Sequence, residues 1–365
     1  MVDKIVGFGP DGRATRPYKF VHQIPLVVDT TDLAAPAGAD IQHFLSADAT
    51  AADLLKPPGN QSHLTRIRNT GGGRLDEMFM ATTHSKFYSA INTVGIAPCI
   101  VGKSNMFRKS HLETLTDPSQ NPKLPAPRGG GEHPVGIDYF SDYICEDHLI
   151  GDLLWRSKMP GFGNHGFVLG DFAIQPVDGM SVAAYAGRRV RWLRARKWTV
   201  LVATLVEPGV EPLLCCAYFS FAVTTIPWFH EALGAPQTWG AMFGIWICAI
   251  TLWMLVDRMV FKRLHSGGTV VPDADTPRFA KGTSNPAGTP QRSFLPWLAA
   301  WVGRELLALP IWTWAVLLGT TVSWRGRTFT VRMDMSVVEK GSAGMGSRRV
   351  TPEVELGRSR KNRVD

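Results

Sequence analysis

Three long apolar runs constrain what this chain can fold into more than any other feature of its sequence. They cover residues 198–229, 238–256 and 294–324. Each is long enough, or nearly so, to cross a hydrocarbon core of about 30 Å, which takes about 20 helical residues. Buried helices of a soluble protein are the alternative. A membrane protein is favoured because tryptophans gather near the ends of the runs, where membrane helices meet lipid headgroups: Trp198, Trp228, Trp239, Trp253, Trp297, Trp301 and Trp324.

The charge and the cysteines indicate the surroundings of the polar part. The formal net charge of +8 is concentrated beside the apolar runs and toward the C-terminus. It favours an anionic lipid bilayer as the partner, and we expect no nucleic-acid partner. The five cysteines are odd in number and include no C-x-x-C pair, and Cys215 and Cys216 lie within the first run. This pattern argues against a disulfide framework and predicts a polar part that faces the reducing cytosol.

Before the first apolar run, strand-like and helix-like segments alternate, which predicts an α/β unit over residues 1–197. Two segments rich in proline and glycine, at about residues 33–73 and 117–134, are predicted to be loop insertions. The membrane region follows over residues 198–324, and residues 325–365 are predicted to be a basic, disordered tail. Within the α/β unit we expect strands at 18–29, 99–107 and 167–174 and helices at 75–92, 109–116, 146–155 and 182–197.

Ionisable residues inside the apolar runs leave the topology open. Glu207 and Glu211, each followed by proline, would be costly if they faced lipid. Either residues 198–212 lie in the membrane interface and only 213–228 span, or the two carboxylates face a cavity lined by protein. Arg304 and Glu305 raise the same question in the third run. A third span would also place the basic tail opposite the other basic groups, against the positive-inside rule, which a re-entrant third segment would avoid.

An acidic pair and a later basic motif point to sugar transfer from a nucleotide. Asp147 lies in the first turn of a predicted helix, and Arg188-x-x-Arg191-Trp192 follows later in the chain. Such a transfer needs a carboxylate to take the proton of the acceptor hydroxyl, and cations to stabilise the departing diphosphate. The planar guanidinium groups of Arg188 and Arg191 suit the diphosphate, and the Trp192 ring suits a sugar or the apolar surface of an acceptor.

Plainer interpretations of these residues stay open at this point. Asp147 also fits a helix-start carboxylate that the helix dipole stabilises. The basic residues at 188–197 also fit a stripe that holds the domain to anionic lipid. By contrast, Gly102-Lys103-Ser104 does not complete a phosphate-binding loop, because Ala97 stands where that motif needs glycine.

Taken in order, a set of short segments resembles the ceramide glucosyltransferases, membrane enzymes that make glucosylceramide from UDP-glucose and ceramide. The Arg-x-x-Arg-Trp motif is shared with cellulose, chitin and hyaluronan synthases, so a processive polysaccharide synthase is the alternative, as is a non-catalytic membrane remnant. The ordered set as a whole is more specific than that motif. It comprises residues 75–109, which include His84 and Cys99, then 143–147, 188–192, 206–208, 301–305 and 323–325.

The resemblance implies a nucleotide-sugar transferase domain of the GT-A type, of α/β class, followed by α-helical membrane segments. It implies a multi-pass Golgi membrane protein whose catalytic part faces the cytosol. The implied reaction is the inverting transfer of glucose from UDP-glucose to the primary hydroxyl of ceramide, in sphingolipid biosynthesis. Asp147 corresponds to the catalytic base, and a divalent metal, Mg²⁺ or Mn²⁺, is expected. The implied substrate-binding residues are Arg188, Arg191, Trp192, His84 and Cys99.

The chain departs from the family pattern near its beginning. Residues 1–17 are polar and contain no apolar anchor, and Asp3 and Asp11 lack the pattern that flanks the first two acidic motifs of the family. We therefore expect the chain to hold the C-terminal part of the GT-A domain, with the metal ligands in the missing N-terminal part. On this hypothesis the chain as given is an inactive or impaired fragment.

Overall fold

A three-stranded sheet organises the first half of the chain in the computed structural model, which describes residues 1–9, 11–31, 63–122, 124, 133–324 and 326–340. The central strand β1 (Tyr18–Asp29) pairs antiparallel with β2 (Asn105–Phe107) and parallel with β3 (Gly163–Val177). Most of β1 is buried, as expected of a strand with neighbours on both edges. The three predicted strands are confirmed, although β2 is shorter than predicted and β3 is longer. A short helix, α1 (Val2–Val6), precedes the sheet.

A nearly continuous helical path packs against the sheet. It comprises α3 (His63–Thr70), α4 (Gly72–Phe79), the π-helical turn η1 (Met80–His84) and α5 (Ser85–Val94). The predicted helix at 75–92 is confirmed, but residues 63–73, predicted as part of a loop, are mostly helical. The rest of that predicted loop lies outside the described residues. Met78, Phe79, Met80 and Ala81 are buried beneath neighbouring elements, so the π-helical turn lies in the interior.

Three further helical elements close the other end of the sheet: α6 (Lys109–Thr116), the 3₁₀ turn η2 (Gly136–Phe140) and α7 (Glu146–Arg156). They pack around Phe20 of β1, which contributes to a core with Leu112, Phe140, Ile150 and Leu154. Helix α8 (Val182–Arg196) begins at Ser181, whose side chain accepts a hydrogen bond from Ala184 N at 3.0 Å. Its residues Tyr185 and Leu193 pack on α4.

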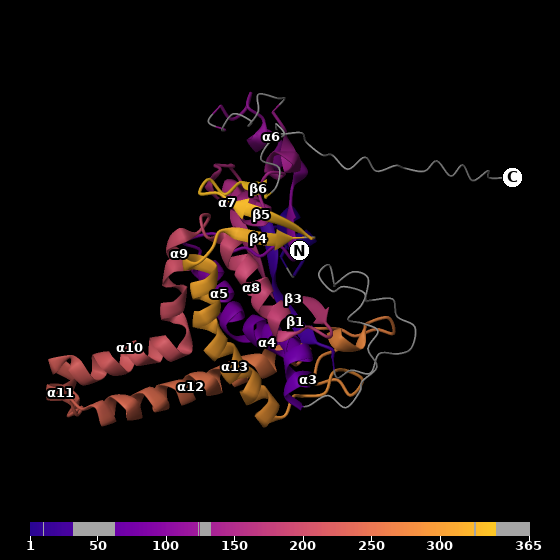
Figure 1. Cartoon of the computed structure of the whole chain (residues 1–365). Coiled ribbons are helices and arrows are strands. Elements are labelled where there is room, and N and C mark those ends of the chain that lie inside the picture. The colour runs from indigo at the N-terminus through magenta and orange to yellow at the C-terminus, as the bar shows by residue number, and fades with distance from the viewer. Residues whose placement is uncertain (10, 32–62, 123, 125–132, 325, 341–365) are drawn as a thin grey trace.

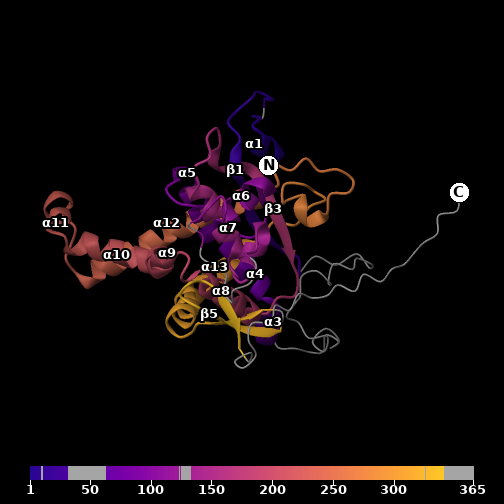
Figure 2. The ribbon, with the colours of Figure 1, turned by 90° about the horizontal axis from the view of Figure 1, so that it is seen from above.

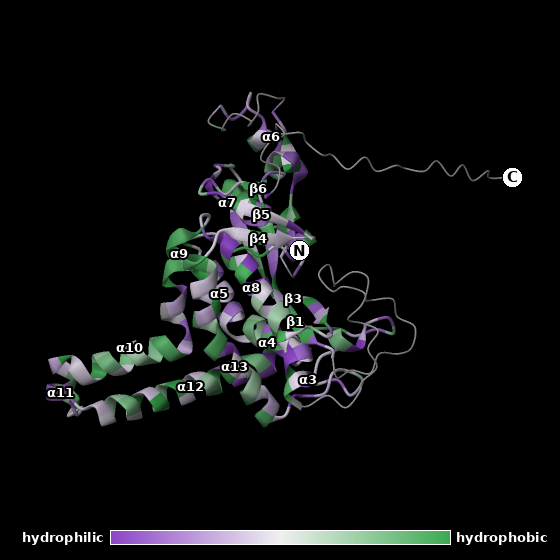
Figure 3. Ribbon diagram, in the orientation of Figure 1, coloured by the Kyte–Doolittle hydropathy of each residue, from purple (hydrophilic) through white to green (hydrophobic). Residues whose placement is uncertain are grey.

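A pair of apolar helices projects from the rest of the molecule (Figures 1 and 2). The first run folds into α9 (Leu201–Val206), the 3₁₀ turn η3 (Glu207–Val210), α10 (Pro212–Thr225) and α11 (Pro227–Leu233), and the second folds into α12 (Trp239–His265). Helices α10 and α12 lie side by side, and hydrophobic residues line their length (Figure 3). Phe219 and Phe243 are more than half exposed. Apolar side chains so exposed on projecting helices indicate a surface that faces lipid.

Within the described ranges, two helical segments are long and apolar enough to cross a membrane, 239–265 and 294–317. Helices α10 and α11, bent by 68° relative to each other, would form a third span if the pair is one. The later segment comprises α13 (Phe294–Trp312) and the π-helical turn η5 (Thr313–Leu317). It packs against the body of the molecule along its length (Figure 1). Trp297 and Trp301 contact the core near Met78, while Ile311 and Val316 contact the core around α8. Protein therefore covers one side of this segment from end to end.

A small antiparallel sheet follows α13, where the sequence predicts the end of the third apolar run and a disordered tail. It comprises β4 (Thr321–Trp324), β5 (Arg327–Val331) and β6 (Val337–Glu339). Trp324 is therefore a strand residue and not the end of a membrane helix. Val337 N donates a hydrogen bond to Asp142 O at 2.9 Å, and Tyr143 bridges to Ser336. This small sheet thus lies beside the loop that precedes α7, and the rest of the predicted tail is outside the described residues.

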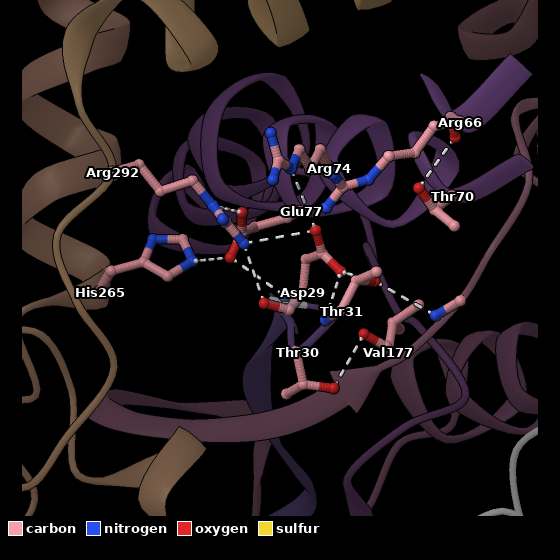
Figure 4. Close-up of polar contacts among 11 residues, drawn as sticks. Asp29, Thr30, Thr31, Arg66, Thr70, Arg74, Glu77, Val177, His265 and Arg292 are labelled. Carbon is pink, nitrogen blue, oxygen red and sulfur yellow. Dashed lines mark hydrogen bonds and ion pairs between the residues drawn. The ribbon is translucent and has the colours of Figure 1, made fainter. Parts of the chain in front are cut away.

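A buried charge cluster joins the end of α12 to the sheet (Figure 4). Arg292 Nε lies 2.7 Å from Glu77 Oε2, and Arg292 Nη2 lies 3.4 Å from Asp29 Oδ2. Arg74 Nε lies 3.6 Å from the same oxygen of Asp29, and His265 Nε2 lies 3.5 Å from Glu77 Oε1. Because these residues come from β1, α4, α12 and the segment before α13, the cluster fixes the projecting helices to the body.

Candidate active site

Asp147 lies in the first turn of α7, as predicted, and its carboxylate lies against the backbone of Gly102. A Cβ atom built on Gly102 would lie 2.9 Å from Asp147 Oδ2, so only glycine fits at that position without a shift. Burial raises the pKa of Asp147, although the backbone N–H and charge of His148 and the thiol of Cys145 oppose that rise. A carboxylate with a raised pKa is a better proton acceptor than an ordinary aspartate.

Arg188 of α8 faces a buried carboxylate that sequence reasoning missed. Arg188 Nη1 lies 3.3 Å from Asp76 Oδ2, and the side chain of Asp76 is fully buried. Burial raises the pKa of Asp76, while the charges of Arg188, Arg189 and Lys103 lower it. The available signal was the Leu-Asp-Glu sequence at 75–77 on the apolar face of a predicted helix, where an acidic residue needs a cationic partner.

Lys103 and Arg191 add to the positive charge around Asp76. Removal from water and the charges of Arg188 and Arg191 together lower the pKa of Lys103 to about 8, against the opposing charge of Asp76. Trp192 lies beneath the guanidinium group of Arg188, with Arg188 Cζ 4.8 Å from its ring centroid. The structure thus brings the predicted residues Arg188, Arg191 and Trp192 together with Lys103, which sequence reasoning had set aside with the failed phosphate-loop motif.

His84 and Cys99 lie beside Tyr88, a third residue that sequence reasoning missed. The His84 ring stacks on the Tyr88 ring, with the centroids 5.4 Å apart. Burial and the charges of Arg189 and Arg196 lower the pKa of His84 to about 3, so this histidine is neutral at physiological pH. Burial raises the pKa of Cys99 to about 11, although the charge of Arg196 opposes it, so Cys99 is a thiol.

Tyr88 connects these two residues to Asp147. Its pKa is raised by burial and then by the charges of Cys99 and Asp147. Its hydroxyl also hydrogen bonds to His22 Nδ1 of β1, which holds the ring in place. His84 and Cys99 are therefore neutral polar groups beside Tyr88, which suits hydrogen bonding and not proton transfer. Their roles stay predictions.

The carboxylates of the first apolar run line a cavity between α8, η3, α10 and α13, as the second of the two alternatives predicts, while the membrane placement of residues 198–212 stays a prediction. Glu207 pairs with Arg196 and with Arg189, whose Nη2 lies 3.1 Å from Glu207 Oε1. Glu211 Oε2 lies 3.0 Å from Arg304 Nη1, and Arg304 also pairs with Glu305. Each ionisable residue of the apolar runs discussed here therefore has a charged partner within the protein.

The residues that the structure describes contain no group of three or more His, Cys, Asp or Glu placed to hold a metal ion. The expected Mg²⁺ or Mn²⁺ therefore has no ligand set in this part of the chain. What the described residues offer is a carboxylate with a raised pKa, Asp147, that lies against Gly102, and a group of cations around Asp76.

A half-buried carboxylate with a raised pKa, a group of cations on and beside α8 and projecting apolar helices are features of one class of protein, the membrane-associated glycosyltransferases. Comparison with known proteins agrees. The family described as Glycosyl transferase family 21 matches residues 132–337. No solved structure matches the chain.

Three curated relatives are all named ceramide glucosyltransferase. The ceramide glucosyltransferase of Pyricularia oryzae is 56% identical over 349 residues, which are 95% of this chain and 63% of that protein. The ceramide glucosyltransferase of Gibberella zeae is 51% identical over 367 residues, 100% of this chain and 69% of that protein. That of Candida albicans is 32% identical, over 89% of this chain and 63% of that protein. This chain belongs to glycosyl transferase family 21, and the resemblance to the ceramide glucosyltransferases is confirmed.

Proposed function

We propose that this chain contributes the residues of a ceramide glucosyltransferase that act on the acceptor hydroxyl and on the departing diphosphate. The proposed reaction is the transfer of glucose from UDP-glucose to the primary hydroxyl of ceramide, with inversion at the anomeric carbon. The observation that carries the proposal is the position of Asp147, half-buried in the first turn of α7 against Gly102, whose chain neighbour Lys103 lies near Arg188 and Arg191. The chain spans about two thirds of the length of its first two relatives, so the complete activity is part of the proposal.

In this mechanism Asp147 accepts the proton of the ceramide hydroxyl as its oxygen attacks the anomeric carbon. The bond from that carbon to the diphosphate breaks, and UDP leaves with the electron pair. Arg188, Arg191 and Lys103 stabilise the negative charge that develops on the diphosphate. His84, Cys99 and Trp192 contact the substrates as neutral groups. A GT-A arrangement, a Golgi location and a cytosolic catalytic part belong to the same proposal, and the mixed sheet and the projecting apolar helices support it.

The test measures glucosylceramide formation from UDP-glucose in membranes of cells that lack this activity. It compares this chain with the same chain preceded by the N-terminal part of the Pyricularia oryzae relative, which we expect to carry the first two acidic motifs. Asp147→Asn should abolish transfer in the active form while UDP-glucose binding persists. The matched control is Glu146→Gln, because Glu146 is the adjacent but exposed carboxylate.

Each outcome bears on a different part of the proposal. Product from the extended form alone supports the assignment together with the hypothesis that this chain is a fragment. Turnover that persists in Asp147→Asn removes Asp147 from the role of base. Formation of a polymer, or no product from either form while the Pyricularia oryzae relative is active in the same membranes, overturns the proposal.

A further inference from the structure

A cavity of about 330 Å³ lies between α8, η3, α10 and α13, away from Asp147. Its volume falls in the range of roughly 300–1,000 Å³ typical of ligand pockets. We propose that this cavity, the α10–α13 cavity, holds a hydrocarbon chain of the acceptor lipid during transfer. The inference rests on the proposed function and assigns the place where the lipid part of the acceptor lies.

The walls of the cavity are apolar and come from the segments with membrane character. Leu213 and Leu214 contribute from α10, Ala308 and Ile311 from α13, and Leu193 from α8. Such a lining favours a hydrocarbon chain over a soluble sugar or water, because apolar surface gains free energy when it is removed from water.

Exposed apolar side chains of α13, a segment with membrane character, form one part of the cavity lining. Leu306 and Leu309 line the cavity, yet they are 63% and 44% exposed. Both belong to α13, and hydrophobic residues of the projecting helices α10 and α12 are exposed as well (Figure 3). A hydrocarbon chain could enter from the bilayer at this point without crossing water, so a membrane lipid is the occupant that we propose.

Polar groups gather on another part of the same lining, as a lipid with a polar head requires. Glu207, Glu211 and Glu305 contribute carboxylates, and Arg189 and Arg304 are their partners. Glu305 is buried, and neither of its carboxylate oxygens receives a hydrogen bond within the described part of the chain, its only partner there being the Arg304 guanidinium. Carboxylate oxygens accept hydrogen bonds from the hydroxyl and amide groups that the head of a ceramide carries.

The cavity borders the candidate active site through Phe79. The Phe79 ring lines the cavity, and Arg189 Cζ lies 3.6 Å from its centroid. On its other side Phe79 approaches His84, with ring centroids 5.7 Å apart, and His84 stacks on Tyr88. A chain held in the cavity would therefore direct the attached head toward the rings of His84 and Tyr88.

The test uses a ceramide that carries a photoreactive diazirine at the end of its acyl chain, with the full chain in membranes. Labelled peptides should contain residues of the cavity wall at 213–214 or 306–312, and excess unmodified ceramide should compete. Ala308→Phe fills the cavity and should reduce this labelling several-fold. Leu295→Phe is the matched control, because Leu295 lies on the same helix, is 73% exposed and does not line the cavity.

Turnover supplies a second readout in whichever form makes glucosylceramide. Ala308→Phe should raise the KM for a long-chain ceramide by about tenfold or more, and that for a short-chain ceramide far less. Leu213→Phe, which fills the cavity from the opposite wall, replaces Ala308→Phe if that variant does not fold. If the label is found outside the cavity, or Ala308→Phe and Leu295→Phe behave alike, the inference is overturned. Labelling of the cavity without glucosylceramide formation would leave the lipid site in place and remove the proposed function.

Discussion

Arg188 Nη1 lies 3.3 Å from Asp76 Oδ2, and this pair links the helix of the Arg-x-x-Arg-Trp motif to the buried helix α4. The Asp76 side chain is fully buried, whereas Arg188 keeps a small exposed edge. Arg188 therefore has one side fixed by a carboxylate and another side, above Trp192, held by the ring. The pair sets the direction in which Arg188 presents its charge.

The first prediction concerns this pair. Asp76→Asn should destabilise the protein by about 3 kcal/mol, because the cations around a buried carboxylate lose their counter-charge. The melting temperature of the purified protein should fall, and combining the change with Arg188→Gln should recover part of the loss, as expected of residues in contact. Asp152→Asn is the control, since Asp152 pairs with Arg156 near the surface. Additive losses in the double variant would show that the two residues do not interact.

The second prediction separates the two interpretations of the basic helix α8. Arg191→Ala should reduce kcat by about 10²-fold or more if the guanidinium stabilises the diphosphate. Arg191→Lys keeps the charge but loses the planar set of donors, so it should recover only part of the rate. Steady-state kinetics with UDP-glucose provide the measurement. Normal rates in both variants, with weaker binding to anionic vesicles, would favour the membrane-anchoring interpretation.

The third prediction uses the pKa of Lys103, which lies at about 8 because of removal from water and the neighbouring arginines. Lys103 loses its positive charge as the pH rises through about 8, so the affinity for the anionic donor should fall over that range. Lys103→Met should bind UDP-glucose more weakly at pH 7 and show a flatter dependence between pH 7 and pH 9. Lys103→Arg should keep its affinity up to pH 9. Equal pH profiles for all three proteins would remove Lys103 from the donor site.

The fourth prediction concerns the charge cluster at the end of α12. Burial alone would raise the pKa of Glu77, but the hydrogen bond and charge of His265 and the charge of Arg292 bring it below its ordinary value of 4.5. A carboxylate with a lowered pKa stabilises the folded state above its unfolded pKa, and this contribution disappears as the pH falls through the folded pKa.

Glu77→Gln should therefore lower the melting temperature at pH 7 and change it much less in acid, below the folded pKa of Glu77. Thermal unfolding of both proteins across this pH range provides the measurement. Glu113→Gln is the matched control, because Glu113 pairs with Lys109 on the surface at 3.4 Å and is 45% exposed. An equal loss at both ends of the range would mean that Glu77 acts through packing and not through its charge.

The sequence predicted those parts of the fold that depend on local patterns. The helix at 109–116 matches α6 residue for residue, and the predicted helix at 182–197 differs from α8 by one residue. Asp147 also falls in the first turn of its helix as predicted, because an acidic pair before an apolar periodic segment is a local signal.

What the sequence could not provide depends on partners far along the chain. The role of Asp76 depends on its ion pair with Arg188, and that of Glu211 depends on its ion pair with Arg304. The apolar run at 294–324 contains a helix covered by protein on one side and then a strand, and hydropathy alone does not distinguish these from a single span. The π-helical turn before Ser85 likewise has no established signal in composition or periodicity.

The contact between Val337 N and Asp142 O has a consequence for the order in which the protein matures. The loop that leads into Asp147 gains its partner strand only after the ribosome has made both projecting helices and α13. The projecting helices α10 and α12 can therefore insert into the membrane before the neighbourhood of Asp147 is complete. The proposed chemistry is assembled last, when the newly made chain is already beside the membrane in which the proposed acceptor lipid would lie.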